Sequence, residues 1–156
     1  MDGPGCRPPF ASVLRHRVPP GVSLPLSFLS RAAAAVLDEL TAGLGVGQSR
    51  KVDRSSVFMA VHVECLHSTP LGPLYSIAHY YESQGDFCCD PDVTLVRTAD
   101  GWSPVSFQNS IAYRVAVHFH EDGTVEADER EQRDLVSFVG TWMENVREQQ
   151  GLSTRR

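Results

Sequence analysis

The chain has 156 residues, of which 42% are hydrophobic and 21% charged, a balance typical of one globular domain. Its longest apolar run, residues 32–37, is far below the roughly 18–20 residues that span a bilayer, so no membrane segment is expected. The net charge of −5 is uneven: residues 1–54 hold seven basic and four acidic side chains, and residues 55–156 hold seven and fifteen. This acidic excess disfavours direct nucleic-acid binding by the folded domain and favours a protein partner with a basic surface.

The N-terminal segment, residues 1–26, is interrupted by proline and glycine and has no sustained periodicity. We therefore expect a disordered or loosely attached tail there, a single domain over residues 27–151, and a disordered C-terminus over residues 152–156. The prolines also interrupt any apolar core of a secretory signal, and the adjacent Cys88 and Cys89 favour reduced thiols. These features predict a cytoplasmic protein.

The first predicted element is an amphipathic helix that begins at Ser27 and ends at Gly43 or Gly45, because leucine, alanine and valine recur there every three or four residues. A polar connector over residues 48–56 follows. The alternation over residues 57–65 then predicts a strand whose one face carries Val57, Met59, Val61, Val63 and Cys65.

The second half of the chain predicts further strands and a final helix. Strands are expected over residues 74–82, 93–97, 102–108, 111–119 and 124–126, with a turn rich in carboxylates between residues 83 and 92. Asp100-Gly101 and Asp122-Gly123 are typical of tight hairpins. A helix is predicted from about Asp128 to Gln150, with Gly151 ending it.

This order of elements predicts an α+β fold. We expect an antiparallel meander sheet of five to six strands, with the N-terminal and C-terminal helices packed on one face. The sequence contains no phosphate loop, nucleotide fingerprint, nucleophile elbow or zinc-finger spacing, so no cofactor and no catalytic residue are predicted.

The main candidate site is an acidic, aromatic surface centred on the middle of the chain. Its predicted partner-binding residues are Tyr81, Glu82, Asp86, Asp90, Asp92 and Trp102. Aromatic side chains rimmed by charge are typical of protein-binding hot spots. The same carboxylates, together with His79, have two other interpretations. One is acid–base chemistry, and the other is a turn in which the carboxylates accept hydrogen bonds from nearby backbone N–H groups.

Two alternatives belong to other functional classes. A metal-binding enzyme or metal-stabilised domain would use His62, His118, His120 and Cys88, whose side chains are good zinc ligands if their strands pair. A nucleic-acid-associated accessory factor would instead use the basic residues of the N-terminal part as an electrostatic arm: Arg7, Arg15, Arg17, Arg50, Lys51 and Arg54.

Several motifs between residues 57 and 151 also resemble an uncharacterised family of small proteins from bacterial plasmids, phages and other mobile elements. The matching residues are Tyr75–Glu82 with Gly85 and Asp86, Asp90 and Pro91, Pro104–Gln108, and Phe138, Trp142, Asn145 and Gln149–Gly151. Cys88 and Cys89 depart from the family's pattern. The resemblance implies a mobile-element setting and no established activity. Together with the acidic charge, it suggests a non-catalytic accessory protein that inhibits a host defence complex of the restriction or CRISPR type.

Overall fold

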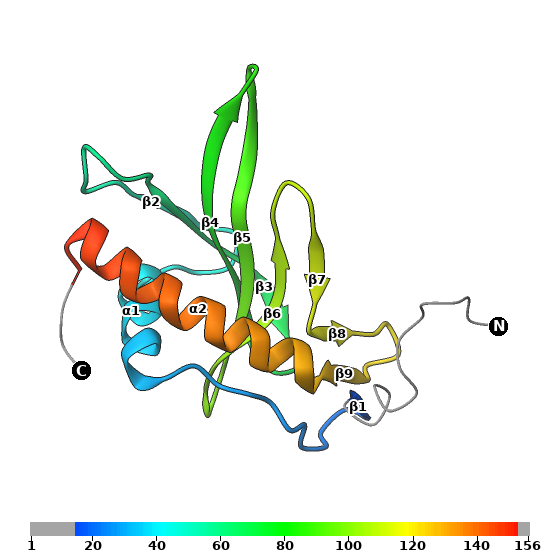
Figure 1. Cartoon of the computed structure of the whole chain (residues 1–156). Helices are drawn as coiled ribbons and strands as arrows, with labels where there is room; N and C mark the ends of the chain where they lie inside the picture. The colour runs from blue at the N-terminus through cyan, green and yellow to red at the C-terminus, as the bar shows by residue number, and fades with distance from the viewer. Residues whose placement is uncertain (1–14, 153–156) are drawn as a thin grey trace.

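A six-stranded antiparallel sheet forms the centre of the structure, a computed structural model that describes residues 15–152 (Figure 1). Its strand order, β2-β3-β4-β5-β6-β7, follows the chain, and a second sheet of three strands has the order β1-β9-β8. The elements are β1 Arg15–Val18, α1 Arg31–Thr41, β2 Ser49–Val52, β3 Val61–Thr69, β4 Gly72–Ser83, β5 Asp86–Thr98, β6 Gly101–Gln108, β7 Tyr113–Val115, β8 Val117–Phe119, β9 Val125–Asp128 and α2 Glu129–Gln150. The predicted α+β class and the antiparallel meander are confirmed.

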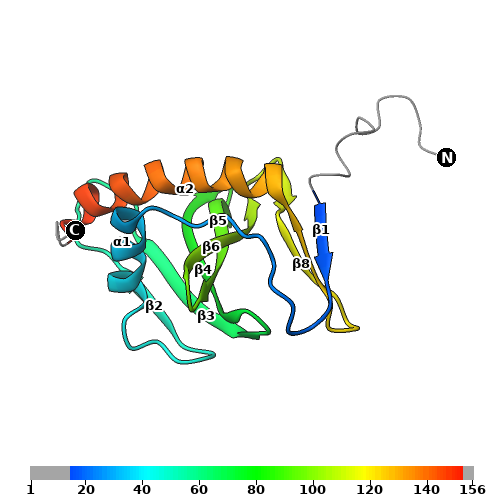
Figure 2. The ribbon, with the colours of Figure 1, turned by 90° about the horizontal axis from the view of Figure 1, so that it is seen from below.

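Both helices pack on one face of the six-stranded sheet, as predicted, and α2 runs across that face with α1 beside it (Figure 2). The main core therefore lies between helices and sheet. It joins Leu37 and Leu40 of α1 and Val139 and Met143 of α2 to inward-facing strand residues such as Ile77. A smaller apolar cluster lies where the two sheets meet. No helix within residues 15–152 is both long enough and apolar enough to cross a membrane.

The ends of α2 are those predicted from the sequence. The Asp128 side chain accepts hydrogen bonds from the backbone N–H groups of Arg130 and Glu131, and Gly151 ends the helix in the left-handed conformation with φ +64°. The start of α1 is different, because Ser30 rather than Ser27 caps it. Ser27 is engaged elsewhere: its N–H donates to Gln132 and its carbonyl accepts a hydrogen bond from Ser103.

Four predictions within the sheet are wrong. The polar connector predicted over residues 48–56 contains strand β2, Ser49–Val52, which pairs with β3. The strand predicted from Val57 begins at Val61, and Val57 itself is 82% exposed. The turn predicted over residues 83–92 is confined to Gln84 and Gly85, since β5 already begins at Asp86. The single strand predicted over residues 111–119 is divided into β7 and β8, which belong to different sheets. In each case, the boundary of the strand is set by where a neighbouring strand pairs with it, and not by the alternation of apolar and polar residues along the segment.

The segment predicted as a tail is partly integrated into the domain. Residues 15–18 form β1, which pairs antiparallel with β9. Leu24 and Leu26 are partly buried against the smaller apolar cluster. Residues 1–14 and 153–156, which hold the rest of the predicted N-terminal tail and of the predicted disordered C-terminus, lie outside the described residues.

Candidate functional site

Strands β4 and β5 extend beyond their neighbours as a long hairpin arm (Figure 1). The pairing of β4 with β3 stops at Ala78, and the pairing of β5 with β6 stops at Asp92. Past these points, β4 and β5 pair only with each other among the described strands. We call residues 79–91 the β4–β5 arm. Because neither side of it is covered by a further strand, the arm exposes two sheet edges to a binding partner.

The tip of the arm is a two-residue turn. Gln84 and Gly85 have φ values of +53° and +88°, and positive φ at both central residues is typical of the tight turns that match strand twist. Gly85 adopts this conformation without strain because it has no Cβ. The local geometry therefore supports a regular hairpin.

Most of the predicted partner-binding residues lie on this arm or at its base. Asp86 and Asp90 are exposed on β5, and Tyr81 on β4 is partly buried. Glu82 belongs to the same strand as Tyr81. Asp92 lies at the base, where its carboxylate accepts a hydrogen bond of 2.7 Å from the Ser76 hydroxyl. These residues are thus brought onto one structural feature.

Trp102 is the exception among the predicted residues, and its predicted place on the contact surface is wrong. Its side chain is 2% exposed and packs against Tyr75 in the main core, with the ring centroids 5.2 Å apart. The indole N–H donates to Asp38 of α1 at 2.9 Å. Trp102 therefore joins β6 to α1 and is not available at the surface.

The charged residues of the arm itself are all acidic. Residues 55–96 contain five carboxylates, Glu64, Glu82, Asp86, Asp90 and Asp92, and neither lysine nor arginine. This stretch includes β3, β4 and nearly all of β5. Because residues 55–96 supply no basic side chain to neutralise these carboxylates, the arm presents a negative potential to solvent.

A shallow pocket of about 230 Å³ lies at the base of the arm, on the sheet face opposite the helices. It is lined by β2, β3 and β4, through Lys51, His62, Glu64, Ser76 and Tyr80 among others. The His62 and Tyr80 rings meet edge to face, with centroids 5.0 Å apart. Tyr80 is not among the partner-binding residues predicted from the sequence, and the shift of register between Ala78 and Tyr80 leaves no local pattern that marks it as exposed.

Two side chains of the pocket, His62 and Tyr80, and Cys89 opposite Tyr80 on β5 have pKa values shifted toward their neutral forms. Burial, and then the nearby Lys51 ammonium, lower the pKa of His62. Burial, and then the Asp92 carboxylate, raise the pKa of the Tyr80 phenol and of the Cys89 thiol. A thiol with a raised pKa is a poor nucleophile at neutral pH, which gives Cys89 no support as a catalytic residue.

The acid–base interpretation of His79 finds no support in its position. His79 is 6% exposed, its ring lies 5.5 Å from that of Trp142 on α2, and its Nδ1 lies 3.0 Å from the Ala60 carbonyl oxygen. Asp92 instead bonds Ser76, on the face of the sheet that carries the pocket. His79 is consequently a packed histidine on the helix side of β4.

The residues of the metal alternative are dispersed. His118 and His120 stack on each other near β8, in the three-stranded sheet, whereas His62 lies on β3 of the other sheet. Cys88 pairs with Tyr81 in the arm. Within residues 15–152, leaving aside the side chains of residues 82, 83 and 87, no group of three or more histidine, cysteine, aspartate or glutamate side chains is arranged to hold a metal ion.

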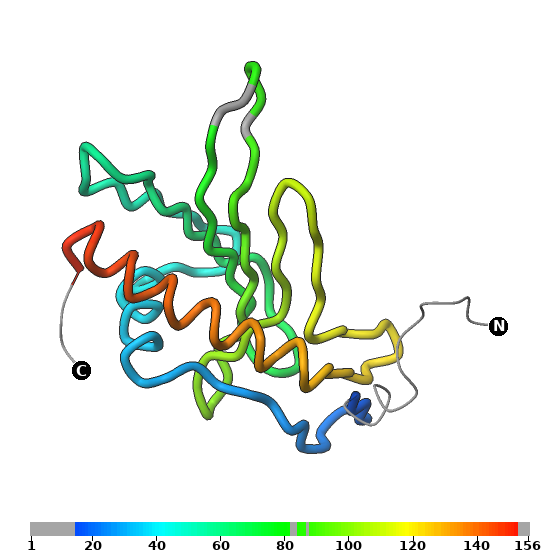
Figure 3. The backbone as a smooth tube through the Cα atoms, in the orientation of Figure 1, coloured from blue at the N-terminus to red at the C-terminus, as the bar shows by residue number. Residues whose placement is uncertain are grey.

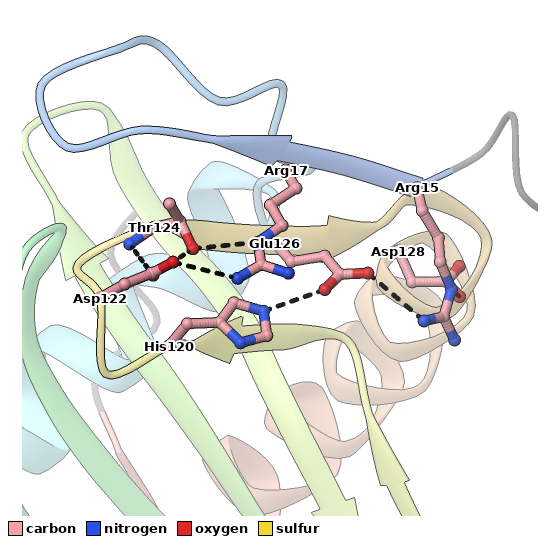
Figure 4. A network of polar contacts seen from close by, with 7 residues as sticks. All are labelled: Arg15, Arg17, His120, Asp122, Thr124, Glu126 and Asp128. Carbon is pink, nitrogen blue, oxygen red and sulfur yellow. Dashed lines mark hydrogen bonds and ion pairs between the residues drawn. The ribbon is translucent and has the colours of Figure 1, made fainter.

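The basic residues of the N-terminal part are largely engaged in ion pairs within the domain. Arg15 lies 3.4 Å from both Glu126 and Asp128, and Arg17 lies 3.3 Å from Asp122, so β1 is held to the β8–β9 hairpin (Figure 4). The Arg50 guanidinium donates to backbone carbonyls at the end of α1. These contacts leave less positive charge for a nucleic-acid phosphate. Arg7 lies outside the described residues.

A comparison with protein-family models places the chain among known sequences. Residues 33–152 match the model of a domain of unknown function, DUF6908. The chain belongs to this family. The match includes most of α1, the whole six-stranded sheet and α2, so the β4–β5 arm is part of the family's domain and β1 is outside the match. No curated protein and no solved structure matches the chain.

Proposed function

We propose that this DUF6908 domain is a non-catalytic protein-binding module whose β4–β5 arm contacts a basic surface of another protein. The observation that carries the proposal is the arm itself, a hairpin that extends past both neighbouring strands in a stretch of sequence without lysine or arginine. A projecting element with unneutralised charge of one sign is suited to enter a groove of the opposite charge.

The arm also offers side chains that favour protein contacts. Tyr80 is 37% exposed at its base and Tyr81 is partly exposed beside it. Tyrosine contributes a large contact area at a low cost in side-chain entropy and is enriched in binding hot spots. Carboxylates around such an aromatic centre steer a basic partner and set the salt dependence of binding.

A more specific form of the proposal concerns the biological setting. The resemblance described above implies an accessory protein of a mobile genetic element, and an acidic arm is suited to occupy the nucleic-acid channel of a host defence complex of the restriction or CRISPR type. Support for this form comes from the charge of the arm and from that resemblance. In this setting, the partner's own nucleic acid would compete with the arm for the channel.

The experiment is affinity capture from a host lysate on the immobilised domain, with elution by increasing salt and identification of the eluted proteins. The wild-type domain is expected to retain a basic protein. The variant Asp86→Asn/Asp90→Asn/Asp92→Asn should release that protein at lower salt, because three carboxylates of the arm and its base are neutral. Binding of the purified partner is then measured for both forms.

The matched control changes the same number of charges elsewhere. Asp100, Glu121 and Glu144 are exposed and lie outside the arm, so Asp100→Asn/Glu121→Gln/Glu144→Gln alters the net charge equally. A decrease of affinity specific to the arm variant supports the proposal. If the two triple variants bind the partner equally well, the arm is not the contact surface.

A further inference from the structure

Three loops emerge from the same end of the six-stranded sheet. In an antiparallel meander, the β2–β3, β4–β5 and β6–β7 connections must lie at one end, and the backbone trace shows them there, spread apart with the β4–β5 connection between the other two (Figure 3). The central connection is the tip of the β4–β5 arm. The outer two, residues 53–60 and 109–112, flank it on either side.

The loop on the β3 side exposes large apolar side chains. Val57, Phe58 and Met59 are 82%, 48% and 47% exposed. Their backbone is nevertheless held in place, because the buried Gln150 side chain accepts a hydrogen bond from the Arg54 N–H and donates one to the Met59 carbonyl. Apolar side chains on an anchored backbone lose less entropy on binding than those on a free loop.

The loop on the β6–β7 side repeats this arrangement. Ile111 is 90% exposed and Tyr113, where β7 begins, is 66% exposed. The Asn109 side chain accepts hydrogen bonds from the N–H groups of Ile111 and Ala112 and so defines the turn. Isolated exposed apolar residues need no explanation, but here they gather on two loops at one end of the sheet.

We propose that these two apolar tips, Val57–Met59 and Ile111–Tyr113, form one docking surface with the acidic arm between them, and that its occupant is a basic, amphipathic protein segment. The proposal rests on the proposed function and specifies the chemistry of the partner. Charge complementarity selects the occupant: carboxylates of the arm attract arginine and lysine, while the tips on both sides bury apolar side chains of the same segment.

The composition of the surface favours this occupant over a nucleic acid. The tip of residues 109–113 contains no charged residue, and the arm carries only negative charge. In the β2–β3 loop, Arg54 is paired with Glu39 and Asp53 with Lys51. A phosphate backbone would find no cation on the arm or at either apolar tip.

The test uses two short synthetic peptides as probes, one of alternating arginine and leucine and one of alternating arginine and serine. Fluorescence anisotropy measures their binding to the full chain. The wild-type chain should bind the arginine–leucine peptide about tenfold more tightly, the effect typical of apolar hot-spot contacts. The variant Phe58→Ser/Ile111→Ser should lose this preference. It should bind both peptides with the affinity that the wild-type chain has for the arginine–serine peptide.

Two further variants make the result specific. Val22 and Val46, 51% and 59% exposed in other loops, provide the control Val22→Ser/Val46→Ser, which should keep the preference for leucine. Because Phe58 is about half buried, Val57→Ser/Ile111→Ser repeats the test with the two most exposed tip residues and should lower the preference in the same direction.

The outcomes separate this proposal from the proposed function. Asp86→Asn/Asp90→Asn/Asp92→Asn should weaken binding of both peptides while the preference for leucine remains. If that variant binds both peptides like the wild type, the acidic arm is not a binding surface and the proposed function fails. If it weakens both but the tip variants keep the full preference for leucine, only the docking role of the tips is overturned.

Discussion

Replacement of Gln150 by leucine tests how the β2–β3 loop is held. Gln150 is the last residue of α2, 2% exposed, and its side chain forms hydrogen bonds of 2.7 Å with the Arg54 N–H and 3.0 Å with the Met59 carbonyl. Leucine has a similar volume and helix propensity but forms neither bond. The variant therefore removes both anchors of the loop with little change in packing.

The expected loss of stability follows from these two bonds. Each contributes about 1–1.5 kcal/mol, because the backbone groups left behind are partly buried and lose their partner. The free energy of unfolding should therefore decrease by about 2–3 kcal/mol. With a urea dependence of about 2 kcal/mol/M, the midpoint of unfolding should decrease by about 1–1.5 M.

Urea unfolding followed by tryptophan fluorescence measures this change, since Trp102 and Trp142 are both buried in the native protein. Hydrogen exchange should also show faster exchange of the Arg54 amide. The control is Gln149→Leu, at the preceding and only partly buried position, which should stay within about 0.5 kcal/mol of the wild type. Equal midpoints for the two variants would show that Gln150 does not anchor the loop.

Three further predictions concern the fold. Gly72→Ala should destabilise the protein by about 3 kcal/mol or more in thermal unfolding, because φ is +142° and a Cβ would lie 2.1 Å from the Arg97 carbonyl oxygen; a near-native midpoint would refute the clash. Gly151→Ala should cost about 1 kcal/mol in urea unfolding, since only glycine adopts φ +64° without strain, and no loss would contradict its role in ending α2. The hydrogen bond from His120 lowers the pKa of the Glu126 carboxyl, so its stabilisation is present above about pH 4.5 and is lost as the pH falls through the lowered value. The stability difference between wild type and Glu126→Gln should accordingly decrease from pH 6 to pH 3, and a constant difference would exclude this linkage.

The β4–β5 arm shows which features of the candidate site can be predicted from the order of neighbouring residues and which cannot. Alternation along residues 74–82 correctly predicts a strand, and Gly85 correctly marks a turn. The carboxylates and the proline after Gly85 resemble a long turn, but pairing with Tyr80–Ser83 of β4 draws Asp86–Cys89 into a strand instead. Cross-strand pairing is a nonlocal contact, so the sequence of β5 alone does not show that the hairpin projects as an arm.

The burial of individual side chains likewise cannot be predicted from neighbouring residues alone. Trp102 lies in a correctly predicted strand, yet its packing against Tyr75 and its hydrogen bond to Asp38 on α1, 64 residues earlier, are contacts with other elements that the strand's own sequence does not show. Likewise, β1 is too short to have a recognisable period. Its place at the edge of β9 comes from antiparallel pairing with that strand, accompanied by ion pairs of Arg15 and Arg17 with the β8–β9 hairpin.

The sequence by itself determined the α+β class, the meander order, the ends of α2 and the acidic charge of residues 55–96, because caps, turns, periodicity and charge are properties of neighbouring residues. Only the tertiary structure decided which strands extend beyond the sheet, which aromatic side chains stay exposed and which loops lie at the same end. Those properties depend on contacts between segments far apart in the chain, where packing and pairing override local preference.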